Sequence, residues 1–455
     1  MTARRFVRSP MLAGFALCML AACSDSSAPV LTDVSRIAKV GQINHVVVIY
    51  LENRSFDNLY GEFPGADGLV NARSSPLQVD ASGAAYATLP QTADSRIPSG
   101  LPNAPFLIDT YLSPAVPTRD LSHSFYQEQQ QINGGRMDKF VVISDALGLV
   151  MGHYRTAGLP LAAEAAKYTL LDHFFHGAYG GSFLNHIWLV AAATPVFPNA
   201  PAAAVAQLDA NGNVVKYGFV TPDGYAVNTA FTVNAPHPAS EPAANLLPNQ
   251  TLPTIGDRLT DKGVSWAWYS GGWNNALAGR ADPSFQFHHQ PFAYFAKYAD
   301  GTAAKAEHLR DETEFVASAK AGTLPAVSFI KPLGAFNEHP GYTDVVTGEN
   351  HVLELIKAVR EGPNWKDAAI IITYDENGGF WDHVSAPKLD RWGAGTRVPT
   401  LVISPFSRHG VVDHTPYETT SILTFIERRF GLAPLSTRDA ASGDLSTAFD
   451  FTQTP

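Results

Sequence analysis

HVVVIYLENRSF, residues 45–56, joins a run of apolar residues to an abruptly polar turn. The apolar residues at 46–51 are continuous rather than alternating, which is typical of a strand that is buried on both faces of a helix-covered sheet. The run ends directly in Glu52, Asn53 and Arg54. Because ligands of open α/β sheets bind beyond the carboxyl ends of the strands, this turn is either an ordinary polar loop or one side of a binding site.

Three further apolar runs predict strands of the same sheet, at 326–331 (AVSFIK), 368–374 (AAIIITY) and 398–404 (VPTLVIS). Apolar residues at helical spacing predict helices over 351–362 and 417–431, and 159–175 reads as a helix or as a helix followed by a strand. This alternation predicts an α/β fold with a central, mostly parallel sheet that is covered by helices on both faces. Turn signals between short β-prone runs predict an inserted β-hairpin within 195–250.

The composition describes a globular protein rather than a disordered one, with 45% hydrophobic and 16% charged residues among 455. We expect residues 41–455 to form a single domain. The formal net charge of -10 argues against general nucleic-acid binding, which needs a basic face. It does not exclude a phosphorylated substrate, because a bound metal ion inverts the field within one cleft.

Residues 1–22 are predicted to be a signal peptide, because three arginines precede a short apolar run and then small residues. The stretch LAAC, residues 20–23, resembles a bacterial lipobox, so we expect Cys23 to become the lipidated first residue. Simple cleavage near Ala22 is the alternative. Residues 23–40 read as a tether. The chain is therefore expected in the periplasm or cell envelope, with a lipid anchor at Cys23 as its only membrane contact and, without Cys18, no disulfide.

A second predicted strand ends as the first one does, because the run at 368–374 is followed by Asp375, Glu376 and Asn377. If both strands lie in one parallel sheet, their carboxyl ends share an edge and the acids converge. Clustered carboxylates repel one another unless a cation lies between them, and their oxygen atoms suit a hard or borderline divalent ion. For a single acid a loop cap is the commoner role, whereas the two clusters together favour a metal site.

A candidate nucleophile lies in GAYGGSFLNHIWL, residues 177–189. Gly180 and Gly181 permit a tight turn before Ser182, and the residues that follow are typical of a helix. A serine at a helix start lies at the positive end of the helix dipole, where an incoming anion is favoured. Ser182 is either a simple N-cap or a nucleophile activated by a metal. The spacing of the hydrolase elbow GxSxG is absent.

Histidines complete the candidate set, at positions 123, 288, 289, 339 and 383. Their spacing does not match a known zinc motif. A single histidine is more often structural than functional, but a protonated imidazole suits a phosphate oxygen or a leaving group. We place His383 outside the direct contacts of the site.

Taken together, these motifs resemble the bacterial acid phosphatase and phospholipase C superfamily of phosphoesterases. The resemblance covers most of residues 41–440 in order, through HVVVIYLENRSFDNLYGEFPG, TLLDHFFHGAYGGSFLNH, FQFHHQPFAYF, FNEHPGY, YDENGGFWDHV and VPTLVISPFSRHGVVDHTPYETTSILTFIERRFGL. It implies an alkaline-phosphatase-like α/β core over 41–455 and one divalent metal ion of unknown identity.

The resemblance also implies roles for individual residues. The metal ligands would be Glu52, Asn53, Ser182, Asp375 and Glu376. Ser182 would in addition be the nucleophile that forms a phosphoseryl intermediate. The phosphoryl group would be surrounded by His123, Asn185, His288, His289 and His339. The tripeptide 184–186 is Leu-Asn-His where many relatives have Pro-Asn-Arg, which leaves the leaving-group side unassigned.

Within the superfamily, serine rather than threonine at position 182 and a chain that stops soon after the last shared motif favour an acid phosphatase acting on phosphomonoesters. A phospholipase C that cleaves phospholipid head groups is the alternative. A lipoprotein that binds phosphate without catalysis is a third reading, which the intact candidate nucleophile argues against. If histidines hold the phosphate as imidazolium ions, activity is expected to fall as pH rises through about 6 to 7.

Overall fold

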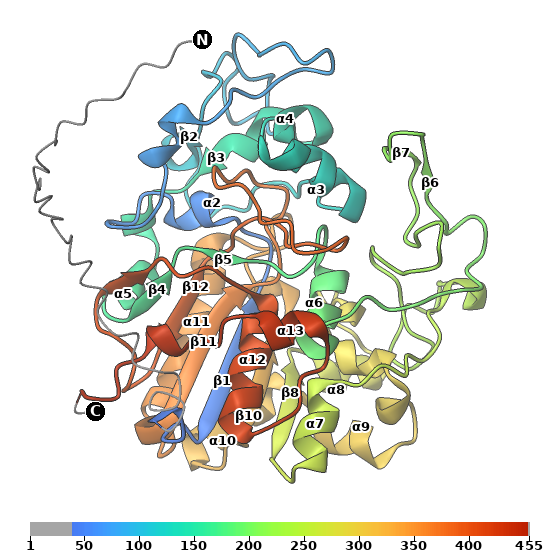
Figure 1. The fold of residues 1–455 in the computed structure, drawn as a ribbon, viewed down its shortest axis with the longest axis vertical. Coiled ribbons are helices and arrows are strands. Elements are labelled where there is room, and N and C mark those ends of the chain that lie inside the picture. The colour runs from blue at the N-terminus through green and yellow to red at the C-terminus, as the bar shows by residue number, and fades with distance from the viewer. Residues whose placement is uncertain (1–38, 454–455) are drawn as a thin grey trace, which may run out of the picture.

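The computed structural model describes residues 39–453, so the predicted signal peptide, Cys23 and nearly all of the predicted tether lie outside the described residues. An eight-stranded sheet forms the centre of the fold (Figure 1). In spatial order its strands are β13 (Val411–Asp413), β4 (Thr169–Leu171), β12 (Thr400–Ile403), β11 (Ala368–Tyr374), β1 (His45–Leu51), β10 (Val327–Lys331), β8 (Trp266–Ser270) and β9 (Leu309–Asp311).

The sheet is parallel except at β12, which is antiparallel to both β11 and β4. The carboxyl ends of all its other strands therefore lie along one edge of the sheet, as predicted for a mostly parallel sheet. Strand β1 pairs with β11 over its whole length, and Leu51 lies opposite Tyr374. The residues that follow these two strands are therefore neighbours in space.

The continuous apolar runs are buried as expected. Residues 46–51 of β1 are fully buried, and every residue of β11 is buried. Helices α6 (Ser182–Ala191) and α12 (Thr419–Phe430) lie on the near face of the sheet, and α10 (Glu312–Ala321) and α11 (Val345–Arg360) lie behind it (Figure 1). Burial on both faces explains why these strands carry no alternating polar residues.

The remaining elements are shorter. Residues 159–175 form a helix followed by two strands, α5 (Ala162–Ala165), β4 and β5 (Phe174–Phe175), and β5 pairs with β14 (Tyr417–Glu418). The predicted hairpin is present as β6 (Gln207–Leu208) and β7 (Val214–Lys216), which project from the body of the protein (Figure 1). The other short elements are α2 (Phe56–Tyr60), β2 (Phe106–Leu107), α3 (Phe125–Ile132), α4 (Phe140–Ile143), β3 (Gly152–His153), α7 (Ile255–Asp261), α8 (Trp273–Leu277), α9 (Ala303–His308) and α13 (Thr437–Ala441).

Among residues 39–453, none of the helices combines the length and the apolar character that crossing a membrane requires.

Candidate active site

A cavity of about 930 Å³ opens at the carboxyl edge of the sheet. Four of the predicted site residues and the predicted nucleophile share its wall, namely Glu52, His123, His288, His339 and Ser182. The sequence-predicted residues therefore converge on one cavity although they are spread over nearly 290 positions of the chain. The rim adds tyrosines, amides and one ion pair, through Tyr217, Tyr342, Gln127, Gln286, Asn228, Arg119 and Asp145.

The end of β1 supplies one side of the site. Glu52 is fully buried, and its Oε2 accepts a 3.0 Å hydrogen bond from Nδ2 of Asn337. Asn53 has a φ of 69°, a left-handed conformation that is uncommon outside glycine and is found preferentially at functional positions. This turn brings Oδ1 of Asn53 to 3.3 Å from the hydroxyl oxygen of Ser182.

The end of β11 supplies the opposite side. Asp375 and Glu376 are both fully buried, and Oε1 of Glu376 lies 3.5 Å from the hydroxyl of Ser182. The second oxygen of Glu376 accepts a hydrogen bond from the backbone N–H of Gly378 at 2.5 Å. The two polar strand ends therefore meet around the serine, as the parallel pairing of β1 and β11 requires.

Ser182 is the first residue of α6, and Gly181 holds the N-cap position. Because Gly181 and not Ser182 holds this position, the alternative reading of Ser182 as an N-cap is wrong, and the serine hydroxyl instead contacts Asn53 and Glu376. Gly180 has a φ of +84°, and a β-carbon there would lie 2.3 Å from the backbone nitrogen of Phe125. Glycine therefore lets the turn before the nucleophile lie against the segment that carries His123.

The side chain of Asn185 makes hydrogen bonds to the backbone of that turn. Its amide nitrogen donates to the carbonyl oxygens of Ala178 at 2.9 Å and Gly180 at 3.1 Å, and its Oδ1 accepts from the backbone N–H of Ala178 at 2.8 Å. The side chain is fully buried and does not line the cavity. The geometry therefore gives Asn185 a positioning role, which differs from the predicted contact with a phosphoryl group.

The histidines gather around the same centre. Nε2 of His123 lies 3.3 Å from Nδ2 of Asn53 and 3.7 Å from Oε1 of Glu376. His288 and His289 end the 3-10 turn Phe287–His289, both are buried, and Nε2 of His289 contacts Oε1 of Glu52. The ring of His339 lies 5.8 Å from that of His123, and it stacks on Tyr342.

Three residues of the site were missed by sequence reasoning. Nζ of Lys331, at the end of β10, is fully buried 3.0 Å from Oε1 of Glu52 and 3.6 Å from Oδ2 of Asp375. His186 stacks on His289 with the ring centroids 5.2 Å apart, and Asn337 holds Glu52. Sequence carried no signal for Lys331, because a lysine at the end of a strand usually reaches solvent.

Burial shapes the ionisation of the acids. Burial raises the pKa of Asp375 to about 7 although Lys331 opposes it, and burial raises the pKa of Glu376 well above its ordinary value although His123 opposes it. For Glu52 burial acts in the same direction, but His289 and Lys331 outweigh it, and the pKa lies well below its usual range. These carboxyl groups outnumber the fixed positive charge beside them.

The histidines divide into two kinds. Burial lowers the pKa of His186, His288, His289 and His339, which favours neutral rings. Burial also disfavours the imidazolium of His123, but Glu376 and Asp120 outweigh it and raise the pKa to about 9. The expected fall of activity between pH 6 and 7 assumed ordinary imidazole groups, whereas none of these five rings has an unshifted pKa.

The donor set fits a divalent cation. Ligand atoms of Glu52, His288 and His289 lie within 4.8 Å of one another, and so do those of Glu52, His186 and Asp375. Buried atoms without a hydrogen-bond partner among the described residues include Oδ2 of Asp375 and Nδ1 of His288. Mixed carboxylate and imidazole ligands in a buried, net-acidic cluster are typical of a metal centre.

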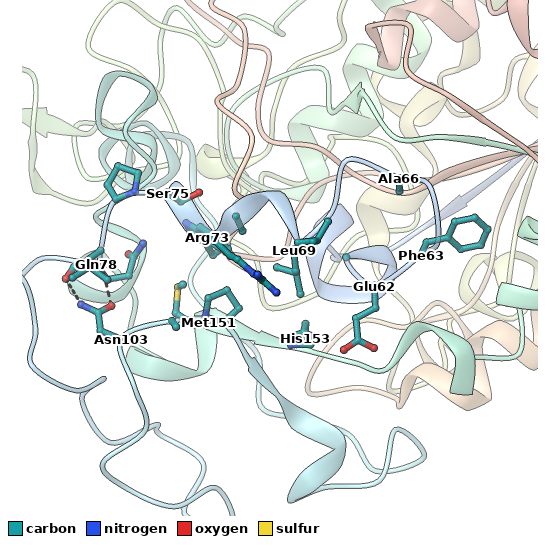
Figure 2. Close-up of a pocket in the computed structure, with 18 of the residues that line it drawn as sticks. Glu62, Phe63, Ala66, Leu69, Arg73, Ser75, Gln78, Asn103, Met151 and His153 are labelled. Atoms are coloured by element: carbon teal, nitrogen blue, oxygen red, sulfur yellow. Dashed lines mark hydrogen bonds between the residues drawn. The ribbon is translucent and has the colours of Figure 1, made fainter.

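A second cavity, of about 600 Å³, is shown in Figure 2 and shares no lining residue with the cavity that contains Ser182. Its walls are mainly apolar side chains and backbone, including Phe63, Leu69 and Met151, and Arg73 extends across it (Figure 2). It is lined by none of the predicted site residues. The candidate active site is therefore the cavity that contains Ser182.

Comparison with known proteins identifies the family. The family model described as "Phosphoesterase family" matches residues 43–433, so the chain belongs to this family. Phospholipase C B of Mycobacterium tuberculosis is 28% identical, over 91% of this chain and 78% of that protein. Non-hemolytic phospholipase C of Pseudomonas aeruginosa is 25% identical, over 91% of this chain and 58% of that protein. Among solved structures, an alkaline phosphatase superfamily protein from Vibrio parahaemolyticus matches with 11% identity and a TM-score of 0.35, over 75% of this chain and 71% of that one.

Proposed function

We propose that this phosphoesterase hydrolyses phosphomonoesters through a phosphoseryl intermediate on Ser182. The observation that carries the proposal is the placement of the serine hydroxyl at the start of α6, between Oδ1 of Asn53 at 3.3 Å and Oε1 of Glu376 at 3.5 Å. The start of a helix favours an anion, and the acceptor oxygens beside the hydroxyl accept its proton or share it. This is the arrangement that a serine nucleophile of phosphoryl transfer needs.

A divalent metal ion would be held by Glu52, Asn53, Ser182, Asp375 and Glu376, with the imidazoles of His288 and His289 beside Glu52. When bound, it would supply positive charge against the phosphoryl oxygens and lower the pKa of the serine hydroxyl. The fit rests on the buried acids of this chain, because Lys331 and the histidines beside Glu52, Asp375 and Glu376 leave Oδ2 of Asp375 without a hydrogen-bond partner among the described residues.

The protein's own groups prepare the reaction. Asn185 holds the turn before α6, so the Ser182 oxygen is fixed before a substrate arrives. Attack of this oxygen on phosphorus forms the serine ester and releases the alcohol, and attack by water then releases phosphate and restores the serine. His123, which is favoured as an imidazolium, donates to a phosphoryl oxygen where negative charge gathers.

A phospholipase C activity is the second candidate. The named relatives are phospholipases C, and the mouth of the cavity is lined by two exposed aromatic side chains, Tyr217 and Tyr342, which are 58% and 45% exposed. An aromatic rim suits a leaving group larger than a simple alcohol. Parallel assays with p-nitrophenyl phosphate and phosphatidylcholine vesicles separate the two. Cleavage of the lipid alone would replace the phosphomonoesterase proposal.

The nucleophile is tested by Ser182→Ala, which should lower turnover of p-nitrophenyl phosphate by at least about 10³-fold, because the variant lacks the oxygen that attacks phosphorus between Asn53 and Glu376. Acid quenching with labelled substrate should trap one phosphate per chain on Ser182. Ser122→Ala is the matched control, since Ser122 lines the same cavity and its backbone N–H donates to Asp145 at 2.8 Å. Retained turnover in Ser182→Ala would refute the assignment.

Export and anchoring at Cys23 belong to the same proposal. A surface or periplasmic enzyme would meet phosphoesters released outside the cytoplasm. Labelled palmitate should be incorporated into the wild type and not into Cys23→Ala, and incorporation that persists in the variant would remove the anchor from the proposal.

A further inference from the structure

A second cluster of histidines and carboxylates lies at the same sheet edge, on its outer strands. Strands β4 and β13 are parallel neighbours, and Leu171 pairs with Asp413 in the register of the sheet. Asp172 and His173 follow β4, and His414 follows β13, so the side chains meet beyond the strand ends. Asp67, from the loop after α2, joins them.

The contacts among these groups are close. Nδ1 of His414 lies 2.8 Å from Oδ2 of Asp172, and Nδ1 of His173 lies 3.4 Å from Oδ1 of the same carboxylate. Nδ1 of His173 also lies 3.1 Å from the carbonyl oxygen of His414. Asp172 is fully buried, and its Oδ1 has no hydrogen-bond partner among the described residues.

Both ring nitrogens of His173 face hydrogen-bond acceptors, whereas a neutral imidazole carries a proton on only one of them. Nε2 lies 3.1 Å from Oδ2 of Asp67, an acceptor, so this nitrogen carries the proton and donates it. In the neutral ring Nδ1 then presents a lone pair toward two further acceptors, Oδ1 of Asp172 and the carbonyl oxygen of His414. Three acceptors that face one another need a cation between them or a second proton on the ring.

We propose that Asp172, His173 and His414 bind a divalent transition metal ion of the zinc class, at a site separate from that of Ser182. Two imidazoles and one carboxylate are a common ligand set for zinc. With bonds of about 2.0–2.1 Å, ligand atoms of a tetrahedral zinc lie about 3.3 Å apart, close to the 3.4 Å between His173 and Asp172. Nδ1 of His414 and Oδ2 of Asp172 lie 2.8 Å apart, so this hydrogen bond would open when the ion binds.

The surroundings support a resident cation. Asp67 occupies the outer position that orients a metal-bound imidazole by accepting from its other nitrogen. The side chain of His414 is 58% exposed, which gives an ion a route from solvent. Carboxyl groups also outnumber cationic side chains next to this cluster, because Asp57, Asp67 and Asp382 contact Arg397 or His383, and Arg397 donates to the backbone carbonyl of Asp172.

This site lies beyond the proposed function, because β12 and β11 separate β4 from the strand end that carries Glu52. The ion would join three chain segments, the loop after α2, the end of β4 and the end of β13. Its expected role is to fasten these segments, and phosphoester turnover should not depend on it.

The test compares zinc binding by the purified full-length wild type and His414→Ala after removal of metal with a chelator. Equilibrium dialysis against zinc, followed by elemental analysis, should show one more zinc per chain in the wild type than in the variant. Turnover of p-nitrophenyl phosphate should be equal in the two. His409→Ala, an exposed histidine that precedes β13 and so lies at the opposite edge of the sheet, is the control and should bind as the wild type does.

Asp67→Asn provides a graded second variant. Loss of the outer carboxylate should weaken zinc at this site by about 10- to 100-fold while keeping the stoichiometry at high zinc. Equal zinc content and equal affinity in the wild type and His414→Ala would overturn the proposal. This outcome is independent of the Ser182→Ala result, so the two proposals fail separately.

Discussion

Charged side chains meet at the carboxyl ends of both the central and the outer strands of the sheet, but they are buried to different degrees in the two places. At the centre, Glu52 and Asp375 are fully buried and share the ammonium of Lys331. At the outer strands Asp172 is equally buried, but its partner His414 is more than half exposed. Parallel strands bring ligands together in both places. The degree of burial then determines how much stability is lost when one charged partner is removed.

Removal of the Lys331 ammonium should have the largest effect on the free energy of unfolding. In Lys331→Met, Glu52 and Asp375 lose their fixed positive partner in a fully buried environment, which should lower the free energy of unfolding by about 3–5 kcal/mol. Urea denaturation of chelator-treated protein measures this change.

Lys320→Met, an exposed lysine of α10, is the control and should change the free energy of unfolding little. Addition of a divalent cation should recover part of the loss in Lys331→Met, because the ion and the ammonium serve the same carboxylates. An unchanged free energy of unfolding in Lys331→Met would show that the Lys331 ammonium does not stabilise the buried Glu52 and Asp375 carboxylates.

His383 should give an intermediate effect that depends on pH. Its ring lies between Asp57 at 2.7 Å and Asp67 at 3.2 Å. Burial opposes the imidazolium, but the hydrogen bond to Asp57 and its charge raise the pKa to about 9. A raised pKa stabilises the fold fully below the unfolded value of about 6.5, and this contribution is lost as pH rises through 9.

The stability difference between the wild type and His383→Gln should therefore be greatest near pH 6, at roughly 3 kcal/mol at most, and should shrink toward pH 9.5. Thermal unfolding at both pH values, in the same ionic strength, measures it. A difference that grows with pH would have the wrong sign for an imidazolium held by two carboxylates.

The smallest effect is expected at the exposed end of the outer cluster. In chelator-treated protein, His414→Ala should change the free energy of unfolding by less than about 0.5 kcal/mol, because the His414 side chain is 58% exposed and Oδ2 of Asp172 keeps its hydrogen bond from the backbone N–H of Asp67. The same urea experiment measures it. A loss as large as that of Lys331→Met would abolish the contrast between the two regions.

Much of the fold was predictable because the apolar runs are long and uninterrupted. Residues 46–51 and 368–374 could be recognised as buried strands, and the parallel pairing of those strands brought Glu52 to Asp375. The reversed direction of β12 was not predictable, because a short apolar strand carries no signal for its orientation. The helix–strand ambiguity of 159–175 was resolved only by tertiary pairing of β4 with β12 and β13.

In the site, sequence indicated which residues gather there better than it indicated which side chains each of them contacts. The convergence of His288 and His289 depends on a 3-10 turn that local sequence does not specify. Asn185 was predicted to contact the phosphoryl group because its position matches a motif, but its amide donates hydrogen bonds to carbonyl oxygens of its own turn. Lys331 was overlooked because a strand-terminal lysine usually reaches solvent, and only the packed sheet shows that it does not.

The reversed strand β12 has a consequence for how the protein could be diversified. Because β11 and β12 run in opposite directions, the connection between them starts and ends at the ligand edge of the sheet. Residues 375–399 therefore begin with Asp375 and Glu376 beside the nucleophile and reach Arg397 beside the outer cluster. A single loop exchange would transplant parts of both regions at once, so this connection is a natural module for chimaeras between members of the family.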